Sequence, residues 1–314
     1  MRFFFIVSFL CTSAIGTSFA QQSSPPAQQT DAGLIARMTT PIEITYTDGS
    51  KSSGSGFFFF VFGASDPKIT GPQWRSIDKT FVITNRHVIQ PDKLEKAETL
   101  SFSLRTKGTN GMEWLPILIK GKDIKRVLHI IPDSPVDVAA IDVTKLVNKV
   151  YGDIAKSGQP ALEPSLGVSK DNFPGASPLT VESGDDVIVV GYPRLFIDEY
   201  NKLPILKRGL LITPWGLKYR GQDDFLIDYK GFHGSSGSVV ITKPSNIALQ
   251  NDHLMTSSSK QFLFLGVYSG EPFLPGDIKD TDDEIVQEKV KIDIGQVWYY
   301  YTVQQTIDCP PLEP

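Results

Sequence analysis

Short runs of apolar or alternating residues recur from about residue 40 to residue 275, and they constrain the fold of this chain more than any other feature. Aromatic and β-branched residues fill these runs, and Gly, Pro, Asn or Asp separates one from the next, as is typical of strands joined by turns. The pattern predicts an all-β protein, built as a sandwich or barrel, without a long amphipathic helix before the C-terminal segment. Clear examples are GFFFFVFG (56–63), KTFVITN (79–85), DDVIVVGYP (185–193) and FLFLGVYSG (262–270).

Breaks in this pattern divide the chain into parts. One stretch is rich in Gly, Pro and Ser and poor in strand pattern, so we interpret it as a connector between two β lobes. A polar loop is expected at 243–261, and KIDIGQVWYYYTVQQTID predicts a strand that ends in a short closing helix or continues as strand. The predicted parts are a signal peptide (1–20), a flexible tail (21–33), a first β lobe (34–150), the connector (151–180), a second β lobe (181–275) and a C-terminal segment (276–314).

The first twenty residues have the parts of a secretory signal peptide. Arg2 supplies a positive charge, an apolar run follows, and the small residues Ser18 and Ala20 precede the expected cleavage site. The run is too short to span a membrane comfortably, and Leu10 is too bulky for the position before a lipid-modified Cys11. Because no later segment is long and apolar enough to cross a membrane, we predict no membrane span after cleavage.

Cleavage would leave 294 of the 314 residues and a formal charge of −5, from 30 basic and 35 acidic side chains. This mild acidity gives no reason to expect a nucleic-acid partner. Cys309 would be the only cysteine, so no intrachain disulfide can form, which favours an exported protein of the bacterial periplasm or exterior. The histidines are scattered and no HExxH motif occurs, so we predict neither a metal site nor a cofactor.

Three segments carry residues suited to nucleophilic catalysis by serine, which needs a base and a carboxylate that orients the base. His87 follows the run FVITN and is the candidate base. Asp137 begins DVAAIDV and is the candidate carboxylate, with Asp142 as its rival. Ser236, in HGSSGS, is the candidate nucleophile. Each residue by itself also fits a structural interpretation, namely a hydrogen-bonded histidine, a turn-capping aspartate or a Gly/Ser turn.

Glycines next to Ser236 add a second chemical feature. Gly234 lets the backbone bring its own amide and that of Ser236 toward one point. Two such amides form an oxyanion hole, in which each donor is worth roughly 3–4 kcal/mol. Gly237 permits close packing behind the nucleophile.

Taken together, these segments resemble the chymotrypsin-like serine proteases, in particular the bacterial HtrA-type branch, here without a PDZ domain. The resemblance implies two perpendicular six-stranded β-barrels with the active site between them. The candidate base and carboxylate would come from the first barrel and the nucleophile from the second. The matching pieces are GSGFFF (54–59), ITNRHVI (83–89), DVAAIDV (137–143), VGYP (190–193), GSSGSVV (234–240) and LGVYSG (265–270).

The resemblance also implies residues that bind the substrate. The first subsite would be lined by DYKGFH (228–233), where Lys230 would favour an acidic side chain and Phe232 or His233 would form a rim. The alternative for Lys230 is that it points into solvent, as most lysines do. Gly270 would lie on the strand that pairs with the substrate backbone.

Some residues depart from the family pattern. Ser235 stands where digestive members carry an aspartate that pairs with a freshly cut N-terminus, and no segment resembles their IVGG start. Ser238 and Val239 stand where Gly and Pro are usual. The first two departures agree with each other, so we predict a protein that needs no activation by N-terminal insertion.

The sequence therefore predicts an exported serine endopeptidase that acts on proteins or peptides through an acyl-enzyme intermediate. An esterase of the α/β-hydrolase type is disfavoured, because it would need G-x-S-x-G and alternating helices. The main alternative is the same two-barrel fold with weak or lost catalysis, serving as a module that binds peptides or proteins.

Overall fold

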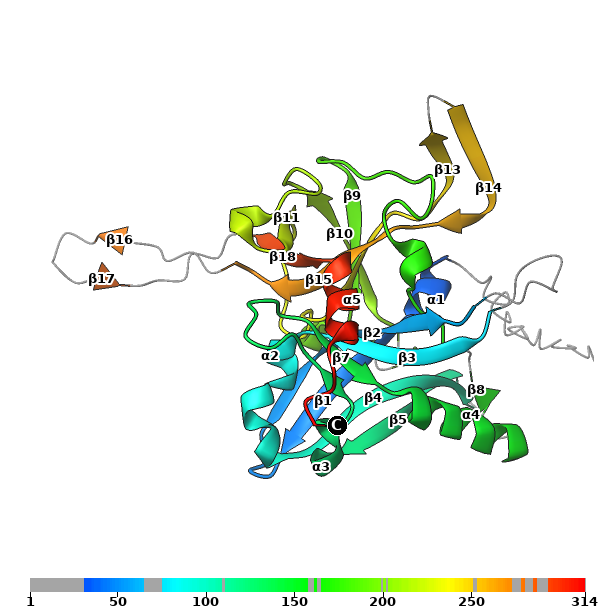
Figure 1. Cartoon of the computed structure of the whole chain (residues 1–314), viewed down its shortest axis with the longest axis vertical. Helices are drawn as coiled ribbons and strands as arrows, with labels where there is room; N and C mark the ends of the chain where they lie inside the picture. Colours follow the sequence, from blue (N-terminus) through cyan, green and yellow to red (C-terminus); the bar gives the residue numbers. More distant parts are fainter. Residues whose placement is uncertain are drawn as a thin grey trace, which may run out of the picture. The chain divides into compact units, whose positions relative to one another are not determined.

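Six strands of the C-terminal half hydrogen-bond into a closed antiparallel barrel in the computed structural model (Figure 1). The strand order around the barrel is β10-β11-β18-β15-β12-β9. Closure gives every strand two neighbours, so the barrel presents no open sheet edge. Its strands are β9 (Asp186–Gly191), β10 (Ile205–Leu211), β11 (Asp224–Asp228), β12 (Val239–Thr242), β15 (Phe264–Gly270) and β18 (Ile294–Tyr299).

The N-terminal half forms a second sheet of eight strands, in the order β5-β4-β1-β2-β3-β7-β6, with β8 paired to β4. Two of the eight, β6 and β8, have only two residues each, so six strands form the body of the sheet. The predicted all-β class is confirmed, and of the two predicted six-stranded barrels the C-terminal one is closed, whereas the N-terminal half forms this eight-stranded sheet. The strands are β1 (Thr39–Tyr46), β2 (Lys51–Phe62), β3 (Ile77–Thr84), β4 (Ala97–Gly108), β5 (Gly111–Lys120), β6 (Leu128–His129), β7 (Ala139–Asp142) and β8 (Ala161–Leu162).

The structure describes residues 31–64, 75–108, 111–157, 161–162, 165–198, 200–201, 203–250, 253–272, 278–279, 285–286 and 293–313. The predicted signal peptide and nearly all of the predicted tail lie outside these residues. The remaining short elements are α1 (Asp31–Ala36), α2 (Arg86–Ile89), α3 (Gly121–Ile124), β16 (Ile278–Lys279), β17 (Ile285–Val286) and the 3₁₀ turns η1 (Pro91–Lys96), η2 (Lys170–Asn172), η3 (Arg194–Phe196) and η4 (Tyr219–Gly221).

Two segments differ from the sequence-based expectation. Residues Thr144–Ser157 form helix α4, so the prediction of no long helix before the C-terminus is wrong. Its apolar side chains pack on the core of the first sheet, but they occupy only positions 146, 147, 150 and 151 before Gly152. The expected polar loop is a hairpin of β13 (Ser245–Gln250) and β14 (His253–Gln261), whose mainly exposed residues carry no alternating apolar signal. Within the described part of the chain, no helix is long and apolar enough to cross a bilayer.

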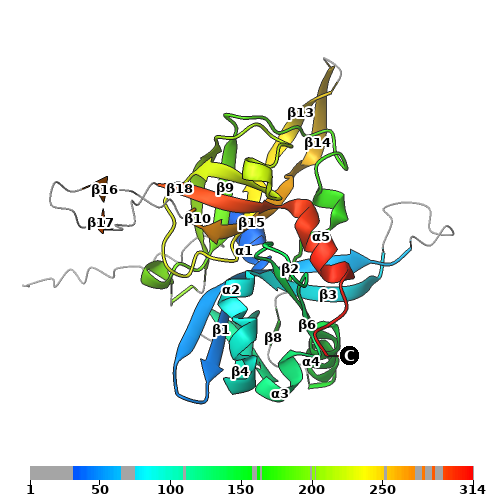
Figure 2. The ribbon, with the colours of Figure 1, turned by 60° about the vertical axis from the view of Figure 1, so that its left-hand side comes forward.

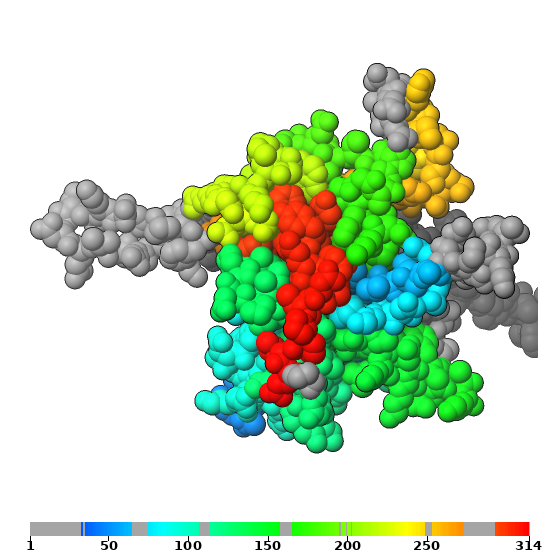
Figure 3. Space-filling view, viewed as in Figure 1, coloured from blue at the N-terminus to red at the C-terminus, as the bar shows by residue number. Residues whose placement is uncertain are grey.

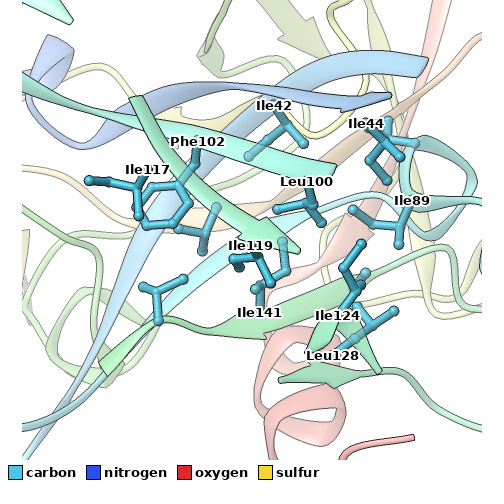
Figure 4. Packing of buried hydrophobic residues seen from close by; sticks show 14 of the residues in the cluster. Ile42, Ile44, Ile89, Leu100, Phe102, Ile117, Ile119, Ile124, Leu128 and Ile141 are labelled. Carbon is cyan, nitrogen blue, oxygen red and sulfur yellow. The ribbon is translucent and has the colours of Figure 1, made fainter. Parts of the chain in front are cut away.

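Strand β2 contributes side chains to two separate hydrophobic clusters. Phe58 and Phe60 face the interior of the first sheet, which Figure 4 shows from close by, whereas Phe57 and Phe59 face the layer between sheet and barrel. Because successive strand residues point to opposite faces, both faces of β2 are buried and its sequence reads as a continuous aromatic run. A third cluster fills the barrel.

The C-terminal segment returns from the barrel to the first sheet. Strand β18 leads into helix α5 (Tyr300–Asp308), which confirms the predicted strand followed by a short closing helix. Beyond α5, the main chain of Leu312 donates to Leu128 O at 3.0 Å, and Cys309 O lies 2.6 Å from His129 Nδ1. Figures 2 and 3 show this red segment running from the barrel along one face to the first sheet.

Asp224 at the start of β11 is a buried carboxylate with incomplete hydrogen bonding. It is 1% exposed, Gln296 Nε2 donates to its Oδ2 atom, and its Oδ1 atom has no partner among the described residues. Burial raises the pKa of Asp224, an effect that the Gln296 bond opposes and the charge of Asp223 reinforces. Its ionised form therefore costs folding free energy at neutral pH.

We expect Asp224→Asn to increase the free energy of unfolding at neutral pH by about 1 kcal/mol, because the buried charge is removed. The gain shrinks as pH falls through the raised folded-state pKa, since the wild-type carboxyl group is then protonated in the folded state as well. Urea unfolding at neutral and acid pH measures both effects. Asp228→Asn, an exposed change on the same strand, is the control. A gain that does not vary with pH contradicts the explanation.

Candidate active site

The imidazole of His87 lies against the carboxylate of Asp137. His87 is in α2, directly after β3, and Asp137 precedes β7, the strand that pairs with β3. His87 Nδ1 is 2.6 Å from Asp137 Oδ2, and the main-chain N–H of His87 donates to Asp137 Oδ1 at 2.8 Å. When Nδ1–H donates to the carboxylate, the lone pair lies on Nε2, where a proton can be accepted. The His87 side chain is half exposed, which leaves it accessible to a substrate.

Neighbouring groups fix the position of Asp137 and give its rival another role. Asn85 Nδ2 donates to the main-chain oxygen of Asp137 at 2.7 Å. Asp142 Oδ1 instead accepts from the main-chain N–H of Thr144 at 3.0 Å, where α4 begins. Asp142 is therefore a turn cap, and Asp137 is the carboxylate that contacts the histidine.

Ser269 joins this pair to the candidate nucleophile. Its hydroxyl donates to Asp137 Oδ2 at 2.5 Å, and its main-chain oxygen accepts from Ser236 Oγ at 3.1 Å. Among the described residues no hydrogen bond joins Ser236 directly to the His87 ring, a contact that often tightens only when substrate binds. Gly270 was among the residues predicted from the sequence and Ser269 was not, because a hydroxyl residue near the end of the apolar run LGVYSG does not identify its partners.

The two glycines that bracket the serines are required by the shape of the loop. Gly234 and Gly237 have φ of +92° and +85°, in the left-handed region that favours glycine. A Cβ atom at Gly237 would lie 2.1 Å from Ser55 O, and one at Gly234 would lie 2.8 Å from Tyr192 O. Each position therefore combines a left-handed backbone with a close approach of another backbone segment.

Ser55, on β2 of the first sheet, holds the nucleophile loop of the barrel half, which comprises residues 232–238. Its main-chain N–H donates to Ser236 O at 2.8 Å, and its hydroxyl donates to Gly234 O at 2.7 Å. The same hydroxyl accepts from the N–H of Tyr192 at 2.7 Å, and Ser55 O accepts from Thr84 Oγ1 at 2.7 Å. The side chain is fully buried, so these bonds are shielded from water.

The amides proposed for the oxyanion hole donate no hydrogen bond to any of the described residues. The main-chain oxygen of His233 accepts a backbone bond at 2.8 Å, and that of Ser235 accepts one at 3.0 Å. Because C=O and N–H point in opposite directions across a trans peptide, the following amides of Gly234 and Ser236 point away from those donors. Within the described residues neither amide donates a hydrogen bond, so both are free to bind an added acceptor.

The residues predicted to bind substrate lie around this loop. Lys230 Nζ is 3.0 Å from Asp293 Oδ1, and both side chains are more than half exposed. This existing ion pair weakens the case for an acid-selective pocket, which stays a prediction. His233 is exposed, and Gly270 pairs with Gln296 at a bulge where β15 meets β18.

Ser235 is bonded within its own loop. It is 1% exposed, and its hydroxyl accepts from the N–H of Phe232 at 3.3 Å. The position that holds an aspartate in the digestive proteases is thus a neutral residue with a local partner.

A cavity of about 270 Å³ opens beside the nucleophile loop. It lies between the first sheet and the segment that follows β9, and its lining includes Gly54, Trp114, Tyr192 and Arg194. Trp114 and Tyr192 meet edge to face, with ring centroids 5.6 Å apart. Gly54 places the cavity next to the nucleophile, since a Cβ atom there would lie 2.9 Å from Ser236 O.

The closed barrel and the adjoining sheet form a chymotrypsin-like fold, in which Ser269 links Ser236 to the contacting pair of His87 and Asp137. No protein-family model matches the sequence, and no curated protein resembles it significantly. Solved structures resemble it only in fold. The serine endoprotease of Yersinia pestis has 14% identity and a TM-score of 0.41 over 89% of this chain, which spans 66% of that protein's length. The inactivated protease paralogue S-I1 of the scabies mite has 12% identity and a TM-score of 0.45, covering 89% of this chain and 96% of its own.

A third neighbour is the protease domain of MamO from Magnetospirillum magneticum, with 11% identity and a TM-score of 0.38, covering 87% of this chain and 96% of its own. The choice between an enzyme and an inactive protein of this fold depends on the residues of this chain.

We expect Ser55→Ala to slow the labelling of Ser236 by a serine-reactive phosphonate by about tenfold to a hundredfold, because the Gly234 peptide loses its anchor and the reacting groups shift. Ser169→Ala is the matched control, since it removes another buried hydroxyl, one that caps η2. Labelling rates and thermal melting are measured for both variants. Equal slowing in the two variants at equal stability would argue against the positioning role.

Proposed function

We propose that this chain is a serine endopeptidase that hydrolyses peptide bonds in protein or peptide substrates. The observation that carries the proposal is the continuous set of contacts from His87 through Asp137 and Ser269 to Ser236. Two unpaired amides next to that serine add the second requirement for acyl transfer. A hydroxyl nucleophile, an oriented base and an oxyanion site are together what attack on an amide carbonyl needs.

Ser236, His87 and the two amides each have a separate role in the proposed reaction. Ser236 Oγ forms a bond to the scissile carbonyl carbon while its proton passes to His87 Nε2. The carbonyl oxygen becomes an oxyanion that the amides of Gly234 and Ser236 bind. The carbon–nitrogen bond then breaks, and the leaving amine takes the proton from His87. Water repeats the sequence on the acyl-enzyme, giving a carboxylic acid and the free serine.

Asp137 has a supporting part in these steps. Its carboxylate faces His87 Nδ1 and stabilises the imidazolium that forms when Nε2 is protonated. Ser269 donates to the same carboxylate oxygen, so it positions Asp137 without touching the reacting atoms. Lone-pair sites of the carboxylate are thus occupied by donors that hold it in one orientation.

A binding module with weak or lost catalysis is the second candidate. One contact favours it, because Ser236 Oγ donates to Ser269 O and has no hydrogen bond to His87 among the described residues. A serine held in that way would present the loop for binding without attacking the substrate.

We also propose that the protein is exported and active without proteolytic activation. The export proposal is supported by the N-terminal sequence, with its Arg2, apolar run and Ala20 cleavage pattern. The activation proposal is supported by Ser235, whose hydroxyl is bonded within the nucleophile loop.

A fluorophosphonate probe separates the enzyme from the binding module. We expect labelling of the folded wild-type protein, loss of labelling in Ser236→Ala, and retained labelling in Ser238→Ala and Ser235→Ala. The probe needs an activated serine, which is the role proposed for Ser236. Absence of labelling in a protein that melts cooperatively would support the binding module.

The activation proposal predicts that protein beginning at Gln21 cleaves casein or a peptide library with an intact N-terminus. Intact-mass spectrometry before and after the assay establishes whether any cut occurs within 21–45. Activity that appears only after such a cut would overturn the proposal.

A further inference from the structure

The side chain of Tyr268 is buried directly beside the nucleophile loop. Its main-chain N–H donates to Ser238 O at 2.9 Å, and its main-chain oxygen accepts from Gly237 N at 2.9 Å. It also precedes Ser269, whose main-chain oxygen contacts Ser236. Only 2% of Tyr268 is exposed. Strand β15 thus brings a large aromatic side chain to the wall of the active site.

The Tyr268 ring fills space that two glycines leave open. A Cβ atom at Gly231 would lie 1.9 Å from the Tyr268 hydroxyl oxygen, and one at Gly295 would lie 2.7 Å from Tyr268 Cε2. Gly231 precedes the nucleophile loop, whereas Gly295 is on β18, the neighbour of β15 in the barrel (Figure 1). The ring is therefore enclosed between two segments that are distant in sequence.

Tyr229 packs against the same ring. The two ring centroids are 5.0 Å apart at an interplanar angle of 69°, and Tyr229 is 5% exposed. Burial raises the pKa of Tyr229 to about 12 and also raises that of Tyr268, so both phenols stay neutral at physiological pH. They extend the apolar core of the barrel toward the nucleophile.

We place the side chain of an acyl group on Ser236 beside residues 228–233, the segment expected to line the first subsite, with the acyl oxygen at the amides of Gly234 and Ser236. Tyr268 and Tyr229 fill the space on that side, because the Tyr268 ring lies against both Gly231 and Tyr229. The open cavity next to Gly54 lies elsewhere around the loop, between the first sheet and the segment after β9.

Resting on the proposed function, we propose that Tyr268 closes the first acyl-side subsite, so that the residue before the scissile bond is glycine, alanine or serine. A leucine, phenylalanine or lysine at that position would need the volume that the Tyr268 ring holds. The ring has little room to move aside, because it is enclosed by Gly231, Gly295 and Tyr229.

A matched peptide series tests this specificity. One sequence is varied only before the scissile bond, with Ala, Ser, Leu, Phe, Lys and Glu. For the mature wild-type protein we expect kcat/KM for the Ala peptide to exceed that for the Phe and Leu peptides by at least about tenfold. In the Tyr268→Ala variant, kcat/KM for the Phe peptide rises by at least about tenfold relative to kcat/KM for the Ala peptide. Tyr268→Val is the second variant should Tyr268→Ala fail to fold.

The control variant is Tyr268→Phe, which keeps the ring and removes the hydroxyl group. It is expected to keep the wild-type order of substrates. Wild-type protein that cleaves Phe, Leu, Lys or Glu peptides as fast as Ala peptides would overturn the inference. An order of kcat/KM values that stays as in wild type in both Tyr268→Ala and Tyr268→Val would also overturn it.

A binding measurement tests the filled pocket independently of catalysis. p-Cresol has the size of the removed side chain, and apolar cavities made by truncation bind such molecules. We expect p-cresol to raise the melting temperature of Tyr268→Ala or Tyr268→Val, but not of wild type or Tyr268→Phe. Folded small variants that do not respond would overturn the inference. If Ser236 is never labelled but p-cresol binds as expected, the proposed function fails while the filled pocket stands.

Discussion

The hydrogen bonds of Ser55 are the interaction on which the site depends most. This buried serine belongs to the first sheet, yet its partners Gly234, Ser236 and Tyr192 belong to the barrel half. Buried donors and acceptors are costly when left unpaired, so the two halves must meet in one relative position to satisfy them. That requirement fixes the nucleophile loop against β2, whose neighbour β3 leads to His87. The packing of the two halves thereby determines the geometry of the site.

The carboxylate of Asp137 is the second point where the halves meet. It accepts from His87 on its own side and from Ser269 on the barrel side. A carboxylate that is mostly covered is stable only with donors around it, and here the donors are the groups whose positions matter for chemistry. The wall beside these donors restricts access to the site, because Tyr268 is packed where we propose that a substrate side chain would enter. The site combines fixed reacting groups with a restricted approach.

Local pattern was sufficient for most strands and for the choice of His87 and Asp137, which lie in contact. Short aromatic and β-branched runs bounded by turn residues predicted strands such as β2 and β9, because such runs are typical of strands that are buried in a sheet. Helix α4 was missed because its apolar face spans barely two turns, and the β13–β14 hairpin because exposed strands need no apolar face. Ser55 and Ser269 were missed for another reason. Their roles come from partners more than 130 residues away in sequence, which no local pattern encodes.

Strand β18 lies between β11 and β15 and completes the barrel, and the segment after it pairs with β6 in the first sheet. Both come after Ser236 in the chain, so part of the wall beside the serine is synthesised after the serine itself. A chain made from its N-terminus therefore carries His87, Asp137 and Ser236 before the barrel around Ser236 can close. For the proposed hydrolase, cleavage of a substrate would begin only after β18 has joined the barrel.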